Sequence, residues 1–77
     1  MYFVYALKSL GRNYIYVGLT DNVERRFGEH QSGNNKTTNA YRPFKIIYVE
    51  KHETRVKARK REIFLKSGVG KEFLITL

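Results

Sequence analysis

The chain contains no cysteine, no tryptophan and only one proline among its 77 residues. Without cysteine there are no disulfide bonds and no thiolate zinc site, which is consistent with a reducing cytoplasm. No apolar run approaches the roughly 20 residues of a membrane span, and Met1 leads directly into a strand pattern rather than into a signal peptide. We therefore expect a cytoplasmic protein that is neither exported nor anchored in a membrane.

Acidic residues are also scarce. Seven Asp and Glu face fifteen Lys and Arg, which gives a formal net charge of +8. Such a balance indicates a polyanionic partner, because cations collect phosphates and release counterions, although a merely solvated basic surface would look the same. The few acids form no DxD cluster, and there is no HxH pair. A site built on two metal ions is therefore not expected.

The length limits the organisation to one domain over residues 1–77. Repeats, linkers and low-complexity segments are absent. Because a chain of this size buries only a small core, any active site must share residues with the packing layer.

The first third of the chain has the pattern of a hairpin followed by a helix. Residues 2–8 and 14–18 are rich in aromatic and β-branched types and flank a short polar turn. The pair Thr20-Asp21 then offers an N-cap, with Glu24 as its capping-box partner, and predicts a helix from about Asn22 to Ser32 that Gly33 ends.

The remainder predicts a loop, a strand and two further elements. Residues 33–43 are polar and end at the only proline, so they read as a loop before a strand over 44–50. Adjacent isoleucines at 46–47 indicate apolar contacts on both faces, as in a central or doubly covered strand. Thr54 caps a helix from Arg55 to Lys66 that ends at Ser67-Gly68.

These elements predict an α+β fold with a small three-stranded, mainly antiparallel sheet flanked by helices. The expected order is β-β-α-β-α, followed by a short C-terminal helix within residues 69–77, for which a strand is the alternative. Apolar residues in this tail either close the core or form a dimer surface.

In the first predicted helix, the helical repeat divides the side chains between a core-facing stripe and the flank beside it. Val23 and Phe27 are four positions apart and should face the core, whereas Arg26 and His30 share the flank beside them. Both flanking residues could simply be solvated. Arg26, however, follows closely after a strand end, where its guanidinium could bind a phosphate with two hydrogen bonds.

Two tyrosines have matched positions. Eleven residues separate Tyr5 from Tyr16, which suits two hairpin strands that bring both rings to one end. A phenol with a pKa near 10 is a poor base, but it can orient a water molecule. Gly18 lets backbone or substrate approach closely, or it serves only the turn.

The second helix carries one isolated carboxylate. Glu62 is the only acid between Glu53 and Glu72, and Arg59 and Lys66 are its helical neighbours. Glu62 has two interpretations: it neutralises those cations, or it faces the sheet near the two tyrosines and binds one Mg²⁺ ion together with water and a substrate phosphate.

The motifs taken together resemble those of GIY-YIG nuclease domains, of the small stand-alone kind related to repair nucleases and homing endonucleases. Phe3-Val4-Tyr5 stands where that family has GIY, and Tyr16-Val17-Gly18 where it has YIG. The remaining matches are a helix with arginine and histidine, a segment into the third strand, and a helix with a glutamate, at residues 20–33, 42–48 and 60–66. Phe3 departs from the pattern at a position that needs a strand residue more than it needs chemistry.

The resemblance implies metal-dependent hydrolysis of DNA phosphodiester bonds, as in DNA repair or recombination. Tyr5 would orient the attacking water, Tyr16 would support the nucleophile or phosphate, and His30 would hydrogen-bond Tyr5 or share its proton. Arg26 would bind the scissile phosphate, and Glu62 would hold a single Mg²⁺ or Mn²⁺. Further candidate substrate contacts are Gly18, Arg25 and Lys66.

The family's domains are often joined to a DNA-binding module, and none follows within these residues. Specificity would then come from a protein partner, a homodimer or the shape of the DNA. The alternative function is a basic nucleic-acid-binding module, for DNA or RNA, that lacks catalysis and acts with a partner.

Overall fold

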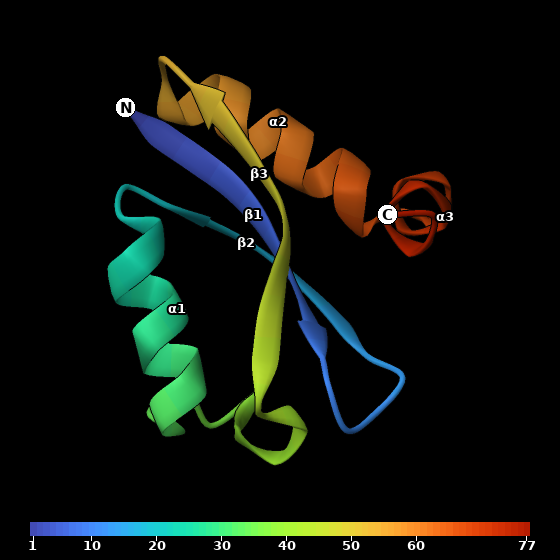
Figure 1. The fold of residues 1–77 in the computed structure, drawn as a ribbon. Helices are drawn as coiled ribbons and strands as arrows, with labels where there is room; N and C mark the ends of the chain where they lie inside the picture. Colours follow the sequence, from blue (N-terminus) through green and yellow to red (C-terminus); the bar gives the residue numbers. More distant parts are fainter.

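A computed structural model describes residues 1–77. The three strands form one sheet, and Figure 1 shows helices on both sides of it. The elements, in chain order, are β1 (Tyr2–Ser9), β2 (Ile15–Thr20), α1 (Val23–Ser32), the 3-10 helix η1 (Asn39–Tyr41), β3 (Phe44–His52), α2 (Arg55–Lys66) and α3 (Gly68–Ile75). The predicted α+β class and element order are confirmed, including a final helix.

The strand order is β2-β1-β3, with both pairs antiparallel. β1 is therefore the central strand and β3 is an edge strand, so of the two arrangements predicted for β3, central or doubly covered, the central one is wrong. The β1–β3 register shifts at an irregularity between Ala6, which pairs with Tyr48, and Leu7, which pairs with Ile46, so regular alternation is interrupted at Ile47. Ile47 is half-buried against the core, whereas Ile46 is 40% exposed.

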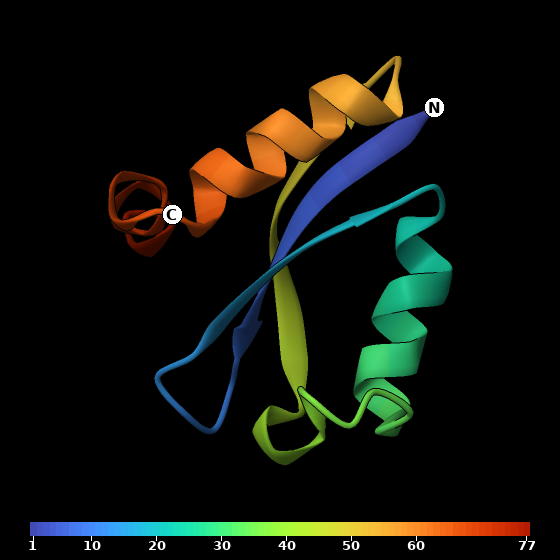
Figure 2. The ribbon, with the colours of Figure 1, turned by 180° about the vertical axis from the view of Figure 1, so that it is seen from behind.

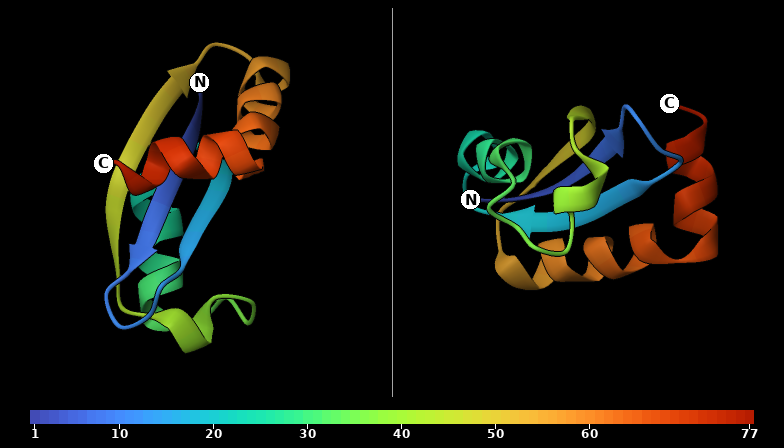
Figure 3. Two further views of the ribbon diagram at one scale, coloured as in Figure 1. Left: turned by 90° about the vertical axis from the view of Figure 1, so that its right-hand side faces the viewer. Right: turned by 90° about the horizontal axis from the view of Figure 1, so that it is seen from below.

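Helices α1 and α2 lie on opposite faces of the sheet. Figure 2 shows the same arrangement from behind, and the right-hand view of Figure 3 shows the sheet edge-on between the two helices. Because successive β1 side chains alternate, each face of the sheet receives a different set of residues from the same strand. No helix is both long enough and apolar enough to cross a membrane.

The N-cap of α1 is Asn22, whose side chain accepts a hydrogen bond from the Arg25 amide at 3.0 Å. The predicted cap at Thr20-Asp21 is wrong, because Thr20 still belongs to β2 and its hydroxyl accepts a bond from the Asn22 amide. The predicted stop is confirmed, since Gly33 adopts a left-handed φ of 83°.

Thr54 caps α2, and the predicted bounds of this helix are confirmed. The predicted glycine stop is wrong, because Gly68 begins α3 and Ser67 joins the two helices. The Ser67 hydroxyl accepts a bond from the Gly70 amide and donates one to the Phe64 carbonyl. α3 therefore turns directly onto the end of α2.

The core has two parts. The α2 face holds an aliphatic cluster of Val4, Ala6, Val17, Ala58, Leu65 and Leu74. The α1 face holds Tyr5, Leu7 and Phe44, with the rings of Tyr14, Tyr16, Phe27 and Tyr41 packed against them. In the C-terminal tail, Leu74 closes the first cluster, whereas Ile75 and Leu77 remain exposed.

Candidate active site

Tyr5 and Tyr16 lie next to each other on the α1 face. In the β1–β2 register Tyr5 pairs with Gly18 and Leu7 pairs with Tyr16, so all four side-chain positions belong to one face of the hairpin. The two tyrosine ring centroids are 6.1 Å apart. Tyr5 is buried, with 1% of its surface exposed, whereas Tyr16 is half-buried and reaches the edge of the sheet.

Gly18 makes room for the ring of Tyr5. A Cβ atom at this position would stand 2.5 Å from the Tyr5 hydroxyl oxygen and 2.9 Å from a ring carbon of Tyr16. Any larger residue would displace one of the tyrosines. The space that Gly18 leaves free is therefore occupied by the protein's own Tyr5 and Tyr16 side chains.

His30 is completely buried beneath the last turn of α1. Its Nε2 atom lies 3.2 Å from the Tyr5 hydroxyl, and its Nδ1 atom lies 2.8 Å from the Thr38 hydroxyl. The expectation that His30 lies on a flank is wrong. Val23 and Phe27 are only half-buried, and the next position of the same helical stripe, seven residues after Val23, is His30.

Arg26 lies between a carboxylate and the phenol. Its guanidinium forms an ion pair with Glu29 at 2.6 Å, and its positive charge also acts on the Tyr5 phenol, whose pKa it lowers against the effect of burial. Arg25 is more exposed and pairs with Asp21 at 3.0 Å, with a longer 3.9 Å approach to Glu29. The closest partner of Glu29 is therefore Arg26.

Burial sets the protonation of the two central groups. It raises the pKa of Tyr5, and the neighbouring Tyr16 adds to the effect, while Arg26 opposes it. Burial also lowers the pKa of His30, and the positive charge of Arg26 lowers it further. At neutral pH the site accordingly holds a phenol hydrogen-bonded to an uncharged imidazole.

A hollow of about 470 Å³ opens beside Arg26, between the start of α1 and the start of α2. Its lining consists of Tyr2, Leu19, Thr20, Asp21, Arg25, Arg26, Glu29 and Arg55. Three of these eight residues are arginines from two helices, so the hollow offers donors suited to a phosphate.

Glu62 lies on the other face of the sheet from Tyr5. Its side chain faces the sheet from α2, beside Ala58 and Leu65, and the residue is only 7% exposed. The carboxylate contacts Arg59 at 2.6 Å and Lys66 at 3.3 Å. It therefore faces the sheet as expected, but from the side opposite the buried Tyr5.

A groove along the outer edge of β2 links the two faces. Lys66 and Lys71 line it together with Tyr14, Ile15, Tyr16 and Val17. Lys66 thus contacts Glu62 on one side and borders the groove of Tyr16 on the other. Of the sequence-predicted residues, Tyr5, Tyr16, Arg26 and His30 gather on the α1 face, Lys66 lines the groove at the edge of β2, and Glu62 lies on the α2 face.

The donor set fits a single hard cation. Nowhere in the chain do three or more His, Asp or Glu side chains cluster as metal ligands. A carboxylate with several water molecules and a substrate oxygen suits Mg²⁺. The present partners of Glu62, Arg59 and Lys66, are 61% and 49% exposed and can swing away from it.

Sequence reasoning missed Thr38 and Arg55, and it did not place Glu29 beside Arg26. Thr38 is completely buried against His30, although the polar segment around it has no hydrophobic period. Nothing in the sequence separates it from the exposed Thr37 beside it. Glu29 could have been paired with Arg26 by its three-residue helical spacing.

The sequence profile of the GIY-YIG catalytic domain matches residues 1–73. The chain belongs to the GIY-YIG family. The tyrosine, arginine and histidine cluster on the α1 face and the glutamate of α2 therefore lie within a domain that this family describes as catalytic. The expected chemistry of such a domain is that of a nuclease, with nucleic acid as its substrate.

Relatives of this GIY-YIG chain include small UPF0213 proteins. It is 44% identical over 66 residues to one from Listeria welshimeri, covering 84% of this chain and 72% of the relative. One from Cupriavidus necator is 36% identical over 66 residues, covering 84% of this chain and 71% of the relative. The solution NMR structure of a UPF0213 protein from Bacillus halodurans is similar, with a TM-score of 0.58 and 30% identity, covering 99% of this chain and 84% of that one.

Proposed function

We propose that this protein is a metal-dependent endonuclease that hydrolyses DNA phosphodiester bonds in the cytoplasm, in DNA repair or recombination. The observation that carries the proposal is the hydrogen bond between Tyr5 and the buried His30, together with Arg26, whose charge acts on the same phenol and which lines a hollow with two further arginines. A buried phenol with fixed partners is costly unless it is fully hydrogen-bonded, and such networks are typical of reactive sites.

Each residue of the cluster has a role in this reaction. Tyr5 orients the attacking water, and Tyr16, half-buried at the sheet edge, supports the water or the phosphate. Arg26 binds the scissile phosphate and stabilises the charge that develops on it. Gly18 contributes by holding Tyr5 in place, while Arg25 in the hollow and Lys66 in the groove contact the DNA backbone.

Glu62 would hold one Mg²⁺ or Mn²⁺ ion. The ion, when bound, polarises the phosphate and stabilises the leaving 3′ oxygen. Lys66 contacts Glu62 and lines the same groove as Tyr16 at the edge of β2, so the scissile phosphate would lie across this edge. Lys66 and Arg59 would then release Glu62 and turn toward the DNA.

Glu29 competes with substrate for Arg26. The two side chains are 2.6 Å apart and both line the hollow. A phosphate that binds there would replace the carboxylate as the partner of the guanidinium. We therefore expect Glu29→Gln to strengthen DNA binding in the absence of metal.

The net charge of +8 supports binding along the DNA backbone. It provides attraction without sequence recognition. Sequence or structure specificity would come from a protein partner, a second copy of the chain, or the shape of the DNA.

The decisive experiment is a cleavage assay on labelled duplex, nicked, flapped and branched DNA, with Mg²⁺, Mn²⁺ or EDTA. Wild type is compared with Glu62→Gln and Arg26→Ala, and Glu72→Gln on the exposed surface of α3 is the matched control. We expect metal-dependent products from wild type and the control, no cleavage by Glu62→Gln, and DNA binding by all four proteins. Binding without cleavage of any substrate would favour the non-catalytic binding module, and full activity of Glu62→Gln would overturn the metal site.

A further inference from the structure

β3 is an edge strand whose outer side is open. In Figure 1 it lies in front of the other two strands, with no helix over it. Two of its apolar side chains, Ile46 and Val49, are 40% and 46% exposed. An open edge invites pairing with another strand unless bulges or lysines prevent it. Because β3 has an irregularity at Ile47 and exposed side chains at Lys45 and Lys51, the positions of these residues determine which strand can pair here.

Successive residues of β1 turn their backbone groups to alternate neighbouring strands. The Leu10 amide, just beyond β1, donates to the Pro43 carbonyl before β3, and the Ser9 amide donates to the Tyr14 carbonyl before β2. Even-numbered residues of β1 thus face β3, and odd-numbered residues face β2. The β3 residues opposite the odd-numbered ones consequently direct their own N–H and C=O groups outward, to the open side.

Ile46 and Val49 are two such residues, since they pair with Leu7 and Tyr5. In a regular strand, outward-facing residues are two positions apart, but the irregularity at Ile47 separates Ile46 from Val49 by three. A regular strand laid along this edge would lose its register here. A second copy of β3, running antiparallel, has the same spacing, so that its Val49 meets Ile46 and its Ile46 meets Val49.

This pairing has a two-fold axis between Ile47 and Tyr48, and it covers exposed apolar side chains. Opposite residues of paired strands project from the same face of a sheet. Ile46 and Val49 both lie on the α1 face, because their β1 partners do. Each exposed isoleucine would therefore pack on an exposed valine of the other copy, and the symmetry makes this contact twice.

The same register matches charges on the α2 face. Lys45 lies opposite Glu50 of the second copy, and the Glu50 side chain is 23% exposed, so the lysine can reach it. Opposite charges at such cross-strand positions attract. Lys51 falls at the end of the pairing, opposite Phe44, whose amide already donates to the side chain of Gln31. The hydrogen-bonded pairing is therefore short and centred on the irregularity.

We infer that β3 is a self-pairing edge, through which two copies of this chain join their three-stranded sheets into one continuous antiparallel sheet. The irregularity and Lys45, which oppose other strands, are matched by the second copy. The inference stands on strand register and charge, and it does not depend on the proposed nuclease function.

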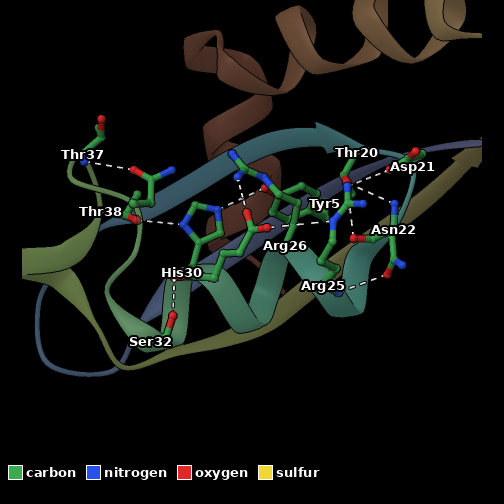
Figure 4. Close-up of polar contacts among 12 residues, drawn as sticks. Tyr5, Thr20, Asp21, Asn22, Arg25, Arg26, His30, Ser32, Thr37 and Thr38 are labelled. Atoms are coloured by element: carbon green, nitrogen blue, oxygen red, sulfur yellow. Dashed lines mark hydrogen bonds and ion pairs between the residues drawn. The ribbon is translucent and has the colours of Figure 1, made fainter.

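The dimer leaves the candidate active site accessible. Figure 4 shows Tyr5 of β1 with Arg26 and His30 of α1. No residue of β3 lines the hollow beside Arg26 or the groove along β2, and β2 would form both outer edges of the joined sheet. Two equal sites would lie on the same face of this sheet, because the two-fold axis is perpendicular to it.

The first test is the molecular mass of the full chain in solution, measured by sedimentation equilibrium over a range of concentrations. We expect a reversible equilibrium between monomer and dimer. A chain that stays monomeric up to about 1 mM, the weak end of specific association, would overturn the inference. Open-ended assembly would also overturn it, because pairing about a two-fold axis closes at two copies.

Charge reversal locates the interface. Lys45→Glu places like charges opposite Glu50 at two symmetric positions and should weaken dimerisation at least about tenfold. Lys60→Glu, on the exposed surface of α2, makes the same change in net charge and should dimerise like wild type. If the two variants dimerise equally, the inference is wrong. Val49→Lys should also weaken the dimer at least about tenfold, and if it does not fold, the exposed Lys45→Glu pair of measurements still decides.

Hydrogen exchange tests the register. The amides of Ile46 and Val49 should exchange more slowly as the protein concentration rises, because only the dimer pairs them. Val17 and Leu19, which point outward from the β2 edge by the same alternation, are the control and should show no such dependence. A dimer without protection at Ile46 and Val49 would use another surface and would overturn the inference. A wild type that dimerises but cleaves no DNA would refute the proposed function and leave this result intact.

Discussion

The two faces of the sheet have different kinds of core, although they share the central strand β1. On the α2 face, Val4 and Ala6 pack against aliphatic side chains. On the α1 face, Tyr5 packs among aromatic rings and against the buried, hydrogen-bonded His30. The first face depends on volume and apolar area, whereas the second also depends on the direction of hydrogen bonds.

This division separates stability from chemistry within a very small domain. Aliphatic burial stabilises the fold by roughly 25 cal/mol for each Å² removed from water, without regard to orientation. A buried polar chain is favourable only when every member is paired, so it tolerates less change. The central strand β1 contributes to both faces, with Val4 and Ala6 on one and Tyr5 and Leu7 on the other.

The largest expected effect is the loss of aliphatic packing. Leu65 is fully buried in the α2-face cluster, so Leu65→Ala should lower the free energy of unfolding by about 2–5 kcal/mol. Urea unfolding would measure the loss. If the two faces respond independently, the NMR signals of His30 in the molecules that remain folded should be the same as in wild type.

Leu65→Met is the control, because it keeps the volume and should cost less than about 1.5 kcal/mol. A change at His30 in the Leu65→Ala variant would show that the two faces are not separable.

A smaller effect is expected at the point where β2 meets Tyr5. Gly18→Ala would place a methyl group 2.5 Å from the Tyr5 hydroxyl oxygen, which should destabilise the protein by about 1–3 kcal/mol and disturb the bond to His30. Gly28→Ala, with open space around it in α1, should instead stabilise by up to about 1 kcal/mol. Thermal unfolding and the His30 spectrum measure both effects. A Gly18→Ala variant with wild-type stability and spectrum would contradict the close packing.

Acid should weaken the two faces in different pH ranges. Because burial lowers the pKa of His30, the unfolded chain binds the proton more tightly, and stability should fall as the pH drops below about 6.5. For Glu50, burial alone would raise the pKa, but hydrogen bonds from Tyr48, His52 and Arg61 outweigh it and lower the pKa. This second contribution should be lost only below about pH 4.3.

Unfolding measured against pH would separate the two ranges. His30→Gln should remove the loss that begins near pH 6.5, and Glu50→Gln should remove the one at lower pH. If His30→Gln leaves the upper range unchanged, the imidazole is not held uncharged by its burial.

The parts of the fold that the sequence predicted are those set by local patterns. α2 was located at both ends because Thr54 is a capping residue followed by a periodic helix. The hairpin and the final helix followed in the same way. For Glu62 the sequence left two readings open, and both apply in part, because the carboxylate is buried and also pairs with Arg59 and Lys66.

The parts that were missed depend on contacts between distant segments. His30 lies 25 residues from Tyr5 and eight from Thr38, and no periodicity predicts that these polar groups are buried together. The edge position of β3 was also missed, because adjacent isoleucines look the same in an edge strand and in a central one. Strand order depends on pairing, which the sequence of one strand does not contain.

The smallest effect is expected for the exposed ion pair at the start of α1. Arg25 and Asp21 are 57% and 63% exposed, so Asp21→Asn should lower stability by at most about 0.5 kcal/mol at low salt and by less at high salt. Chemical unfolding at two salt concentrations measures this. Glu29→Gln is the informative partner, since Glu29 holds the less exposed Arg26 and its removal should change DNA binding more than stability. A loss of more than about 1 kcal/mol in the free energy of unfolding of Asp21→Asn, at both salt concentrations, would contradict this prediction. The first turn of α1 would then be part of the packed α1 face and not a solvated edge of the hollow.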